Sequence, residues 1–99
     1  MSKAKTHPDV EYMVERGIDR GHGRRATDAR YFKDPDEALA AAAMVAMSSG
    51  ESTLSVLIHS EAGAKFHGGD DAVESYREDP EASAHEQYQF KCNAVGRVA

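Results

Sequence analysis

The chain has 99 residues, a net charge of −5 and one cysteine, which fits a single domain over residues 1–99. A single cysteine allows neither an internal disulfide nor a zinc site built from cysteines. The longest apolar run, Leu39 to Met47, is less than half of a membrane-spanning helix. The N-terminus lacks the apolar stretch of a secretory signal. We therefore expect a soluble, cytoplasmic domain whose N-terminus, residues 1–8, is flexible.

Large apolar residues are few. Leu, Ile, Val and Phe supply 15 of the 99 residues, against 16 Ala. A content this low accompanies disorder when the net charge is high. Here these residues are concentrated in periodic segments, so we expect a folded chain with a thin core. A second subunit can complete such a core, and we expect a homodimer or a higher homo-oligomer.

Two strands are predicted near the N-terminus. Over residues 10–18, Val10, Tyr12 and Val14 alternate with polar or charged residues, which is the pattern of a strand with one buried face. A second, less regular strand is predicted over residues 26–33. The glycine-containing stretch between these strands predicts a loop.

The following segment carries the signals of a helix. Asp34 is at the N-cap position, Pro35 is at the first helical position and Glu37 completes a capping box. The alanine-rich body, residues 38–47, has high intrinsic helix propensity. Gly50 is the expected left-handed residue after the C-terminus.

The second half of the chain predicts more strands. Residues 53–60 carry apolar side chains on both faces, which indicates a central strand. We expect a turn at residues 61–64 and a short hairpin partner at 64–67. Residues 68–86 form an acidic insert whose order the sequence leaves open, and it contains a two-turn helix that ends before a proline. A last alternating strand is predicted over 85–95.

The order of these elements predicts an α+β fold. We expect an antiparallel sheet of four to five strands with one main helix on one face, in β-β-α-β-β(-α-β) order. A set of positions spread over the middle half of the chain matches a pattern seen in other proteins. These positions are Phe32, Glu37, Ala38, Ala42, Gly50, Val56, His59, Gly63, Tyr76, Asp79 and Pro80. In these positions the chain resembles small uncharacterised bacterial β-β-α-β-β domain proteins. The resemblance implies the same architecture and supplies no active site.

Charge is segregated along the chain. Residues 1–33 have a balance of +3 and residues 34–99 a balance of −8. Guanidinium groups match phosphate oxygens, so an arginine-rich hairpin loop predicts a nucleic-acid contact. The residues of this prediction are Arg20, Arg24, Arg25 and Arg30. The alternative is that the loop docks on the acidic insert of its own chain or of a neighbouring subunit, and the overall acidity favours this alternative.

Neither a metal site nor a catalytic site is predicted. His59 and His67 could share a metal ion only if a three-residue turn places them opposite each other, and no further ligand is positioned to complete the site. Cys92 falls on the apolar face of the last strand, where a cysteine acts as a small apolar residue. We therefore expect no cofactor and no enzyme activity.

Three functions stay open. The first is an oligomeric binding or regulatory module that contacts nucleic acid. The second is a protein-interaction or structural homo-oligomeric domain. The third is a small-ligand carrier in which several copies of the sheet's open face enclose an apolar molecule. The aromatic residues Tyr12, Tyr31, Tyr88 and Phe90 motivate it, although packing in the core explains them more simply.

Overall fold

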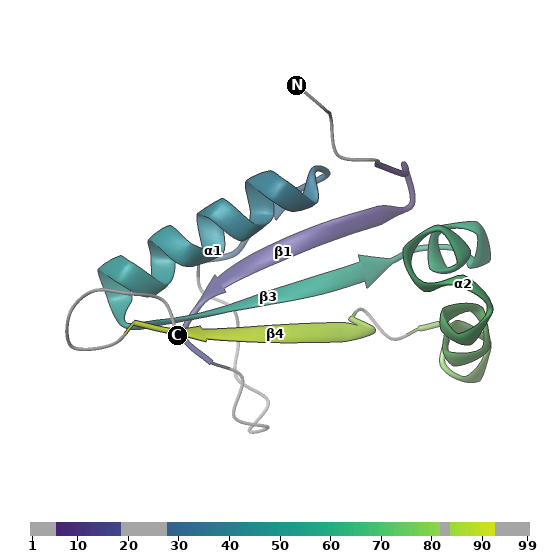
Figure 1. Ribbon diagram of the computed structural model, residues 1–99. Coiled ribbons are helices and arrows are strands. Elements are labelled where there is room, and N and C mark those ends of the chain that lie inside the picture. Colours follow the sequence, from purple (N-terminus) through teal and green to yellow (C-terminus); the bar gives the residue numbers. More distant parts are fainter. Residues whose placement is uncertain (1–5, 19–27, 82–83, 93–99) are drawn as a thin grey trace.

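The computed structural model describes residues 6–18, 28–81 and 84–92 (Figure 1). Four antiparallel strands form one sheet in the order β2-β1-β3-β4. Helix α1 lies across one face of the sheet, and helix α2 lies at one end of the strands. The elements are β1 (Val10–Arg16), β2 (Arg30–Phe32), α1 (Pro35–Ser49), β3 (Glu51–Ile58), α2 (Glu61–Glu78) and β4 (Glu86–Lys91). The predicted α+β class and the antiparallel sheet with a helix on one face are confirmed.

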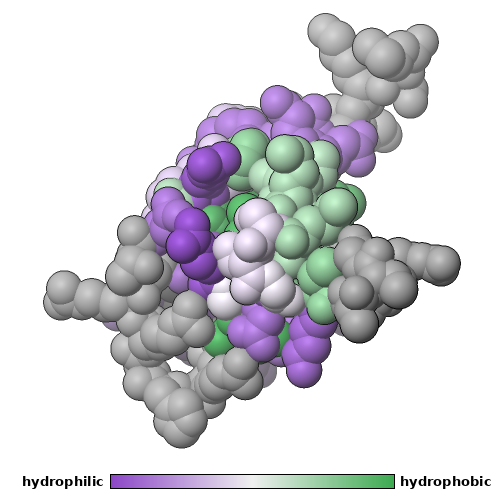
Figure 2. Space-filling model, turned by 90° about the vertical axis from the view of Figure 1, so that its left-hand side faces the viewer, coloured by the Kyte–Doolittle hydropathy of each residue, from purple (hydrophilic) through white to green (hydrophobic). Residues whose placement is uncertain are grey.

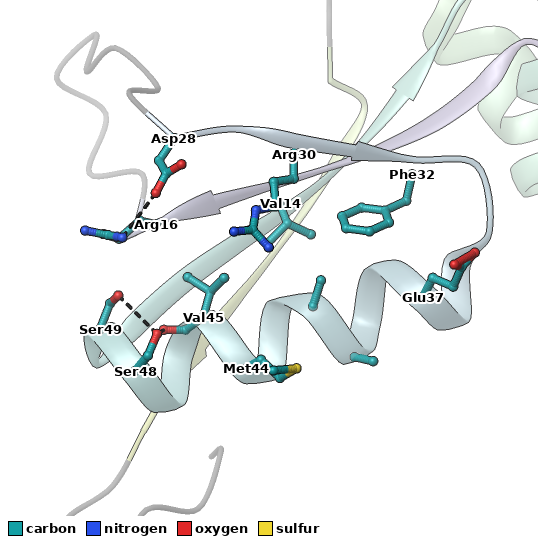
Figure 3. Close-up of a pocket in the computed structure, with 12 residues that line it drawn as sticks. Val14, Arg16, Asp28, Arg30, Phe32, Glu37, Met44, Val45, Ser48 and Ser49 are labelled. Atoms are coloured by element: carbon teal, nitrogen blue, oxygen red, sulfur yellow. Dashed lines mark hydrogen bonds and ion pairs between the residues drawn. The ribbon is translucent and has the colours of Figure 1, made fainter.

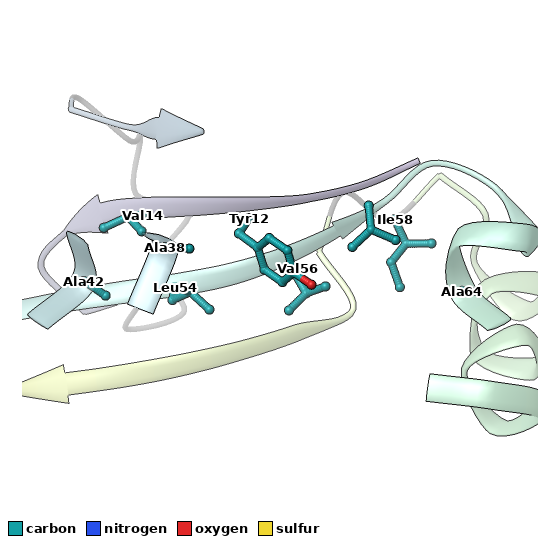
Figure 4. Close-up of a cluster of buried hydrophobic side chains, with 9 residues drawn as sticks. Tyr12, Val14, Ala38, Ala42, Leu54, Val56, Ile58 and Ala64 are labelled. Carbon is teal, nitrogen blue, oxygen red and sulfur yellow. The ribbon is translucent and has the colours of Figure 1, made fainter. Parts of the chain in front are cut away.

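The two central strands carry most of the core. In β1, buried and half-buried residues alternate as predicted. In β3, seven consecutive residues are buried, which confirms the expected central position. Tyr12, Val14, Leu54 and Val56 form the centre of the cluster beneath α1 (Figure 4). Because the largest fully buried side chains among the described residues are valines, this core is thin.

Helix α1 begins and ends where the sequence predicts. The Asp34 carboxylate accepts a hydrogen bond from the N–H of Asp36 at 2.8 Å, and Pro35 is in the first turn. Gly50 has a φ of 88° and donates its N–H to the carbonyl of Ala46 at 2.7 Å.

The face of α1 that meets the sheet is made of alanines. Ala38, Ala42 and Ala46 are fully buried. Small side chains let the helix approach closely, and Ser52 in β3 donates a 2.6 Å hydrogen bond to the Ala42 carbonyl. The alanines add little apolar volume to the core. The helix therefore packs on the sheet through a close approach of the two backbones and not through large interlocking side chains.

The predicted turn at 61–64 and the hairpin strand at 64–67 are wrong, because residues 61–78 form α2. Ser60 caps this helix, since its Oγ accepts the Gly63 N–H at 3.0 Å. The same hydroxyl donates to the Asp9 carboxylate at 2.7 Å and ties the helix to the start of β1. Gly63 makes this docking possible, because a Cβ there would lie 2.9 Å from the Asp9 carbonyl oxygen.

Helix α2 is kinked at Gly69, which has a φ of 72°. Its second part, after the kink, is the two-turn helix that the sequence predicts before Pro80, and it ends at Glu78. The predicted insert over 68–86 is therefore helical over much of its length.

Within the described residues, the outer strands cover parts of the predicted ranges. β2 covers three residues of the predicted 26–33, and 26–27 lie outside the described residues. β4 is present within the predicted 85–95, and 93–95 also lie outside them. Most of the predicted flexible N-terminus, residues 1–5, is likewise not described. Within the described ranges, no helix has the length and apolar character needed to span a membrane.

Candidate ligand-binding groove

An apolar groove lies on the helix face of the sheet, between α1 and β4. We call it the aromatic groove, and its volume is about 350 Å³. Five elements contribute to its walls: β1, α1, β3, α2 and β4. Its lining residues are Tyr12, Pro35, Leu39, Leu54, Val56, His67, Tyr88 and Phe90.

The strand register brings the aromatic residues of this groove together. Leu54 lies opposite Tyr88, Ser52 lies opposite Phe90, and both pairs are on the face that carries α1. Helix α1 covers the centre of the sheet and leaves the β4 edge uncovered (Figure 1). The aromatic side chains of β4 therefore stand beside the helix, and Tyr88 is 46% exposed.

A hydrogen-bonded network lies at the α2 end of the groove. The Tyr88 hydroxyl donates a hydrogen bond to the Glu86 carboxylate, whose other oxygen lies 3.3 Å from Nε2 of His67. The Tyr88 hydrogen bond, assisted by His67, outweighs burial and lowers the pKa of Glu86. The same hydrogen bond, together with burial, raises the pKa of Tyr88. Glu86 is thus held as a carboxylate and Tyr88 as a neutral phenol.

Tyr12 forms the floor of the groove with Val56, its neighbour across β1 and β3 (Figure 4). Burial, and then the Asp34 carboxylate, raises the pKa of Tyr12 and keeps its phenol neutral. The hydroxyl makes no hydrogen bond with any residue in the described ranges. It can therefore donate to, or accept from, a bound molecule.

A second groove lies on the other side of α1, against β2, and we call it the β2 groove (Figure 3). Its volume is about 500 Å³. Arg30 points from β2 toward α1 inside it. Arg16 Nη2 lies 3.1 Å from Asp28 Oδ2, and Glu37 is also in the lining. Two guanidinium groups and two carboxylates therefore balance each other here.

The structure tests the predicted nucleic-acid residues only in part. Arg20, Arg24 and Arg25 lie outside the described residues, and Arg30 is exposed in the β2 groove. The nucleic-acid contact therefore stays a prediction.

The two histidines of the metal hypothesis lie in different surroundings. His59 Nε2 is 3.1 Å from Glu11 Oε1, at the end of β3. His67 is on α2 and contacts Glu86. The arrangement in which they face each other across a hairpin is wrong, because residue 67 is helical. Among the described residues, no three His, Cys, Asp or Glu side chains cluster as metal ligands would.

Of the aromatic residues considered for an apolar ligand, three line one groove, which is on the helix face of the sheet and not on its open face: Tyr12, Tyr88 and Phe90. Tyr31 does not join them, because it pairs with Met13 on the opposite face of the sheet. His67 and Leu39 were missed. His67 reaches the groove only through α2, which the sequence had indicated as a hairpin.

The chain matches no protein-family model, no curated protein and no solved structure. The resemblance to small bacterial domain proteins therefore remains a prediction from the sequence.

Proposed function

We propose that the protein is a non-enzymatic binding module that takes a small, largely apolar aromatic molecule in the aromatic groove. One observation carries the proposal: three aromatic side chains and a polar network converge on a single groove between α1 and β4. Binding sites for small molecules are concave, mostly apolar and supplied with a few placed polar groups. The volume of about 350 Å³ suits a molecule of one or two rings.

The charges around the groove select among such ligands. Glu86 is a carboxylate at its α2 end, and Asp34 is close enough to Tyr12 to raise the pKa of that phenol. Both carboxylates repel an anion and attract a cation. The proposed ligand is therefore neutral or cationic, with its polar group directed toward the Tyr12 hydroxyl or Glu86.

The same network supports binding without turnover. A carboxylate with a lowered pKa is a weak general base. Glu86 is engaged by Tyr88 and His67, so its oxygens are positioned to orient a ligand. We therefore propose no reaction at this site.

Fluorescence anisotropy of indole compounds tests the proposal directly, because the chain contains no tryptophan. Indole is the neutral probe, tryptamine the cationic probe and indole-3-acetate the anionic probe. We expect the first two to bind, and the anion to bind at least about tenfold more weakly because of the two carboxylates. If none of the three binds, or if the anion binds most tightly, the proposal is wrong.

A pair of matched variants locates the binding. Tyr88→Ala removes one wall of the groove and should weaken indole binding. Tyr31→Ala removes a similarly exposed tyrosine from the opposite face and should leave binding unchanged. Equal effects of both substitutions would place the binding elsewhere.

A second candidate function is the nucleic-acid contact predicted from the arginines. Arg30 favours it, because its guanidinium is exposed and makes no hydrogen bond or ion pair with a described residue. The carboxylates of Asp28 and Glu37 in the same groove oppose it.

A further inference from the structure

The outward face of α1 is apolar along most of the helix. Leu39, Met44 and Met47 are 47%, 71% and 59% exposed, and Ala40 between them is also exposed. No charged residue occurs between Glu37 and Glu51. Figure 2, which looks toward the end of the molecule where α1 finishes, shows hydrophobic side chains gathered in one patch with hydrophilic ones beside it. Exposed apolar patches of this kind mark interaction surfaces.

Charges of both signs flank this face: Arg16 of the β2 groove is paired with Asp28, whereas Arg30 makes no ion pair with a described residue. Asp36 is exposed in the first turn of α1 and carries a negative charge. Arg30 lies in the β2 groove, which extends beside α1 to Ser48 and Ser49 in its last turn. Two copies of α1 packed antiparallel would bring Asp36 of each subunit toward the groove that holds Arg30 of the other. The same arrangement opposes the two helix dipoles, which is favourable.

A stable dimer must bury more surface than the outer face of α1 offers, so the proposed interface has to extend beyond the helix. A helix of 15 residues is about 22 Å long and about 10 Å wide. Its outer face alone is smaller than the roughly 800 Å² that each partner of a standard interface buries. The β2 groove beside the helix offers further surface, and its open volume can take the methionine side chains of a partner.

We propose that the outer face of α1 is the interface of a homodimer in which two α1 helices pack antiparallel, with Asp36 of one subunit paired to Arg30 of the other. This inference does not rest on the ligand proposed for the aromatic groove, although Leu39 borders both that groove and this face. It gives the thin core of each subunit an apolar covering supplied by a second copy. Small Ala40 side chains near the crossing point allow the helices to approach closely.

Sedimentation equilibrium of the full chain tests the interface. The wild-type protein should be a dimer at micromolar concentration. Ala40→Glu and Met44→Glu each introduce a carboxylate into the centre of the face and should give monomers. Ala62→Glu makes the same change at an exposed position of α2 and should remain a dimer. Circular dichroism should show equal helix content in all four proteins, because every site is on a helix surface.

A charge exchange tests the proposed ion pair. Arg30→Asp and Asp36→Arg should each weaken the dimer about tenfold, and the double variant should recover most of the loss. A monomeric wild-type protein overturns the proposal. A dimer that survives both glutamate substitutions, or a double variant no better than the single ones, also overturns it. If a glutamate variant fails to fold, the charge exchange still decides the question.

Discussion

The hydroxyl of Tyr88 donates a hydrogen bond to the carboxylate of Glu86, two residues earlier in the same strand. Both side chains project from β4 on the face that carries α1, since their partners in β3 are Leu54 and Val56. The hydrogen bond holds the negatively charged Glu86 carboxylate in a fixed position at the edge of the aromatic groove. It also couples the protonation of Glu86 to the stability of the fold.

Lowering the pH should reduce the unfolding free energy of the wild-type protein more than that of the Glu86→Gln variant. The folded-state pKa of Glu86 is lowered, so the carboxylate contributes stability above its unfolded pKa of about 4.3. That contribution is lost as the pH falls through the folded-state value. Urea unfolding at a series of pH values should therefore show a shallower loss of unfolding free energy in Glu86→Gln below about pH 5. Gln87→Ala, a neighbour without a titratable group, should follow the wild-type slope, and identical slopes in all three proteins would contradict the prediction.

Asp34 should have two separable effects. Asp34→Ala removes the helix cap and should lower the unfolding free energy by about 1 kcal/mol. Asp34→Asn keeps an oxygen for the cap but removes the charge, so it should cost much less. Because the carboxylate helps to raise the pKa of Tyr12, both variants should lower that pKa. The titration is followed by phenolate absorbance, with Tyr12→Phe to identify the signal, and an unchanged Tyr12 titration in Asp34→Asn would refute this effect.

Gly63→Ala should loosen α2 from the sheet. Its Cβ would lie 2.9 Å from the Asp9 carbonyl oxygen, so helix and strand must move apart. We expect a loss of about 1–3 kcal/mol in unfolding free energy, typical of overpacking at a close contact. Ala62→Ser, an exposed neighbour in the same turn, is the control and should cost less than about 0.5 kcal/mol. A Gly63→Ala protein as stable as the control would show that the close approach of α2 to Asp9 does not require a glycine.

Nucleic-acid binding should be detected by gel shift with a mixed-sequence DNA duplex at low salt, where phosphate contacts are strongest. Replacing Arg24 and Arg25 with alanine should weaken the complex and reduce its salt dependence. Arg77→Ala is the control, because that side chain is paired with Glu61 on α2. No complex at low salt would end the nucleic-acid hypothesis.

The sequence predicted those elements whose signals are local. Asp34, Pro35 and Gly50 define both ends of α1 by cap chemistry, which operates within a few residues. The alternation around Tyr12 likewise identifies β1 and its buried face. These features depend on no distant contact, and the structure shows them where the sequence placed them.

The first part of helix α2, before the kink at Gly69, was not predicted because its evidence is not local. Its first turn contains Gly63, a weak helix former, and Gly68 and Gly69 interrupt its middle. The helix is fixed instead by the contact of Ser60 and Gly63 with Asp9, more than fifty residues earlier in the chain. Ser60 at the N-cap and Glu61 in the first turn were local signals of its start. The aromatic groove could be predicted only in part for the same reason, since His67 belongs to this helix.

The alanine face of α1 has a consequence for both grooves. Because Ala38, Ala42 and Ala46 bring the helix so near to β1 and β3, α1 acts as a partition, with Tyr88 and Phe90 on one side and Arg30 and Phe32 on the other. The distance between α1 and the sheet is set by the volume of the methyl groups of these three alanines. A substitution such as Ala42→Val would contact neither groove, yet it would lift the helix and change the depth of both at once.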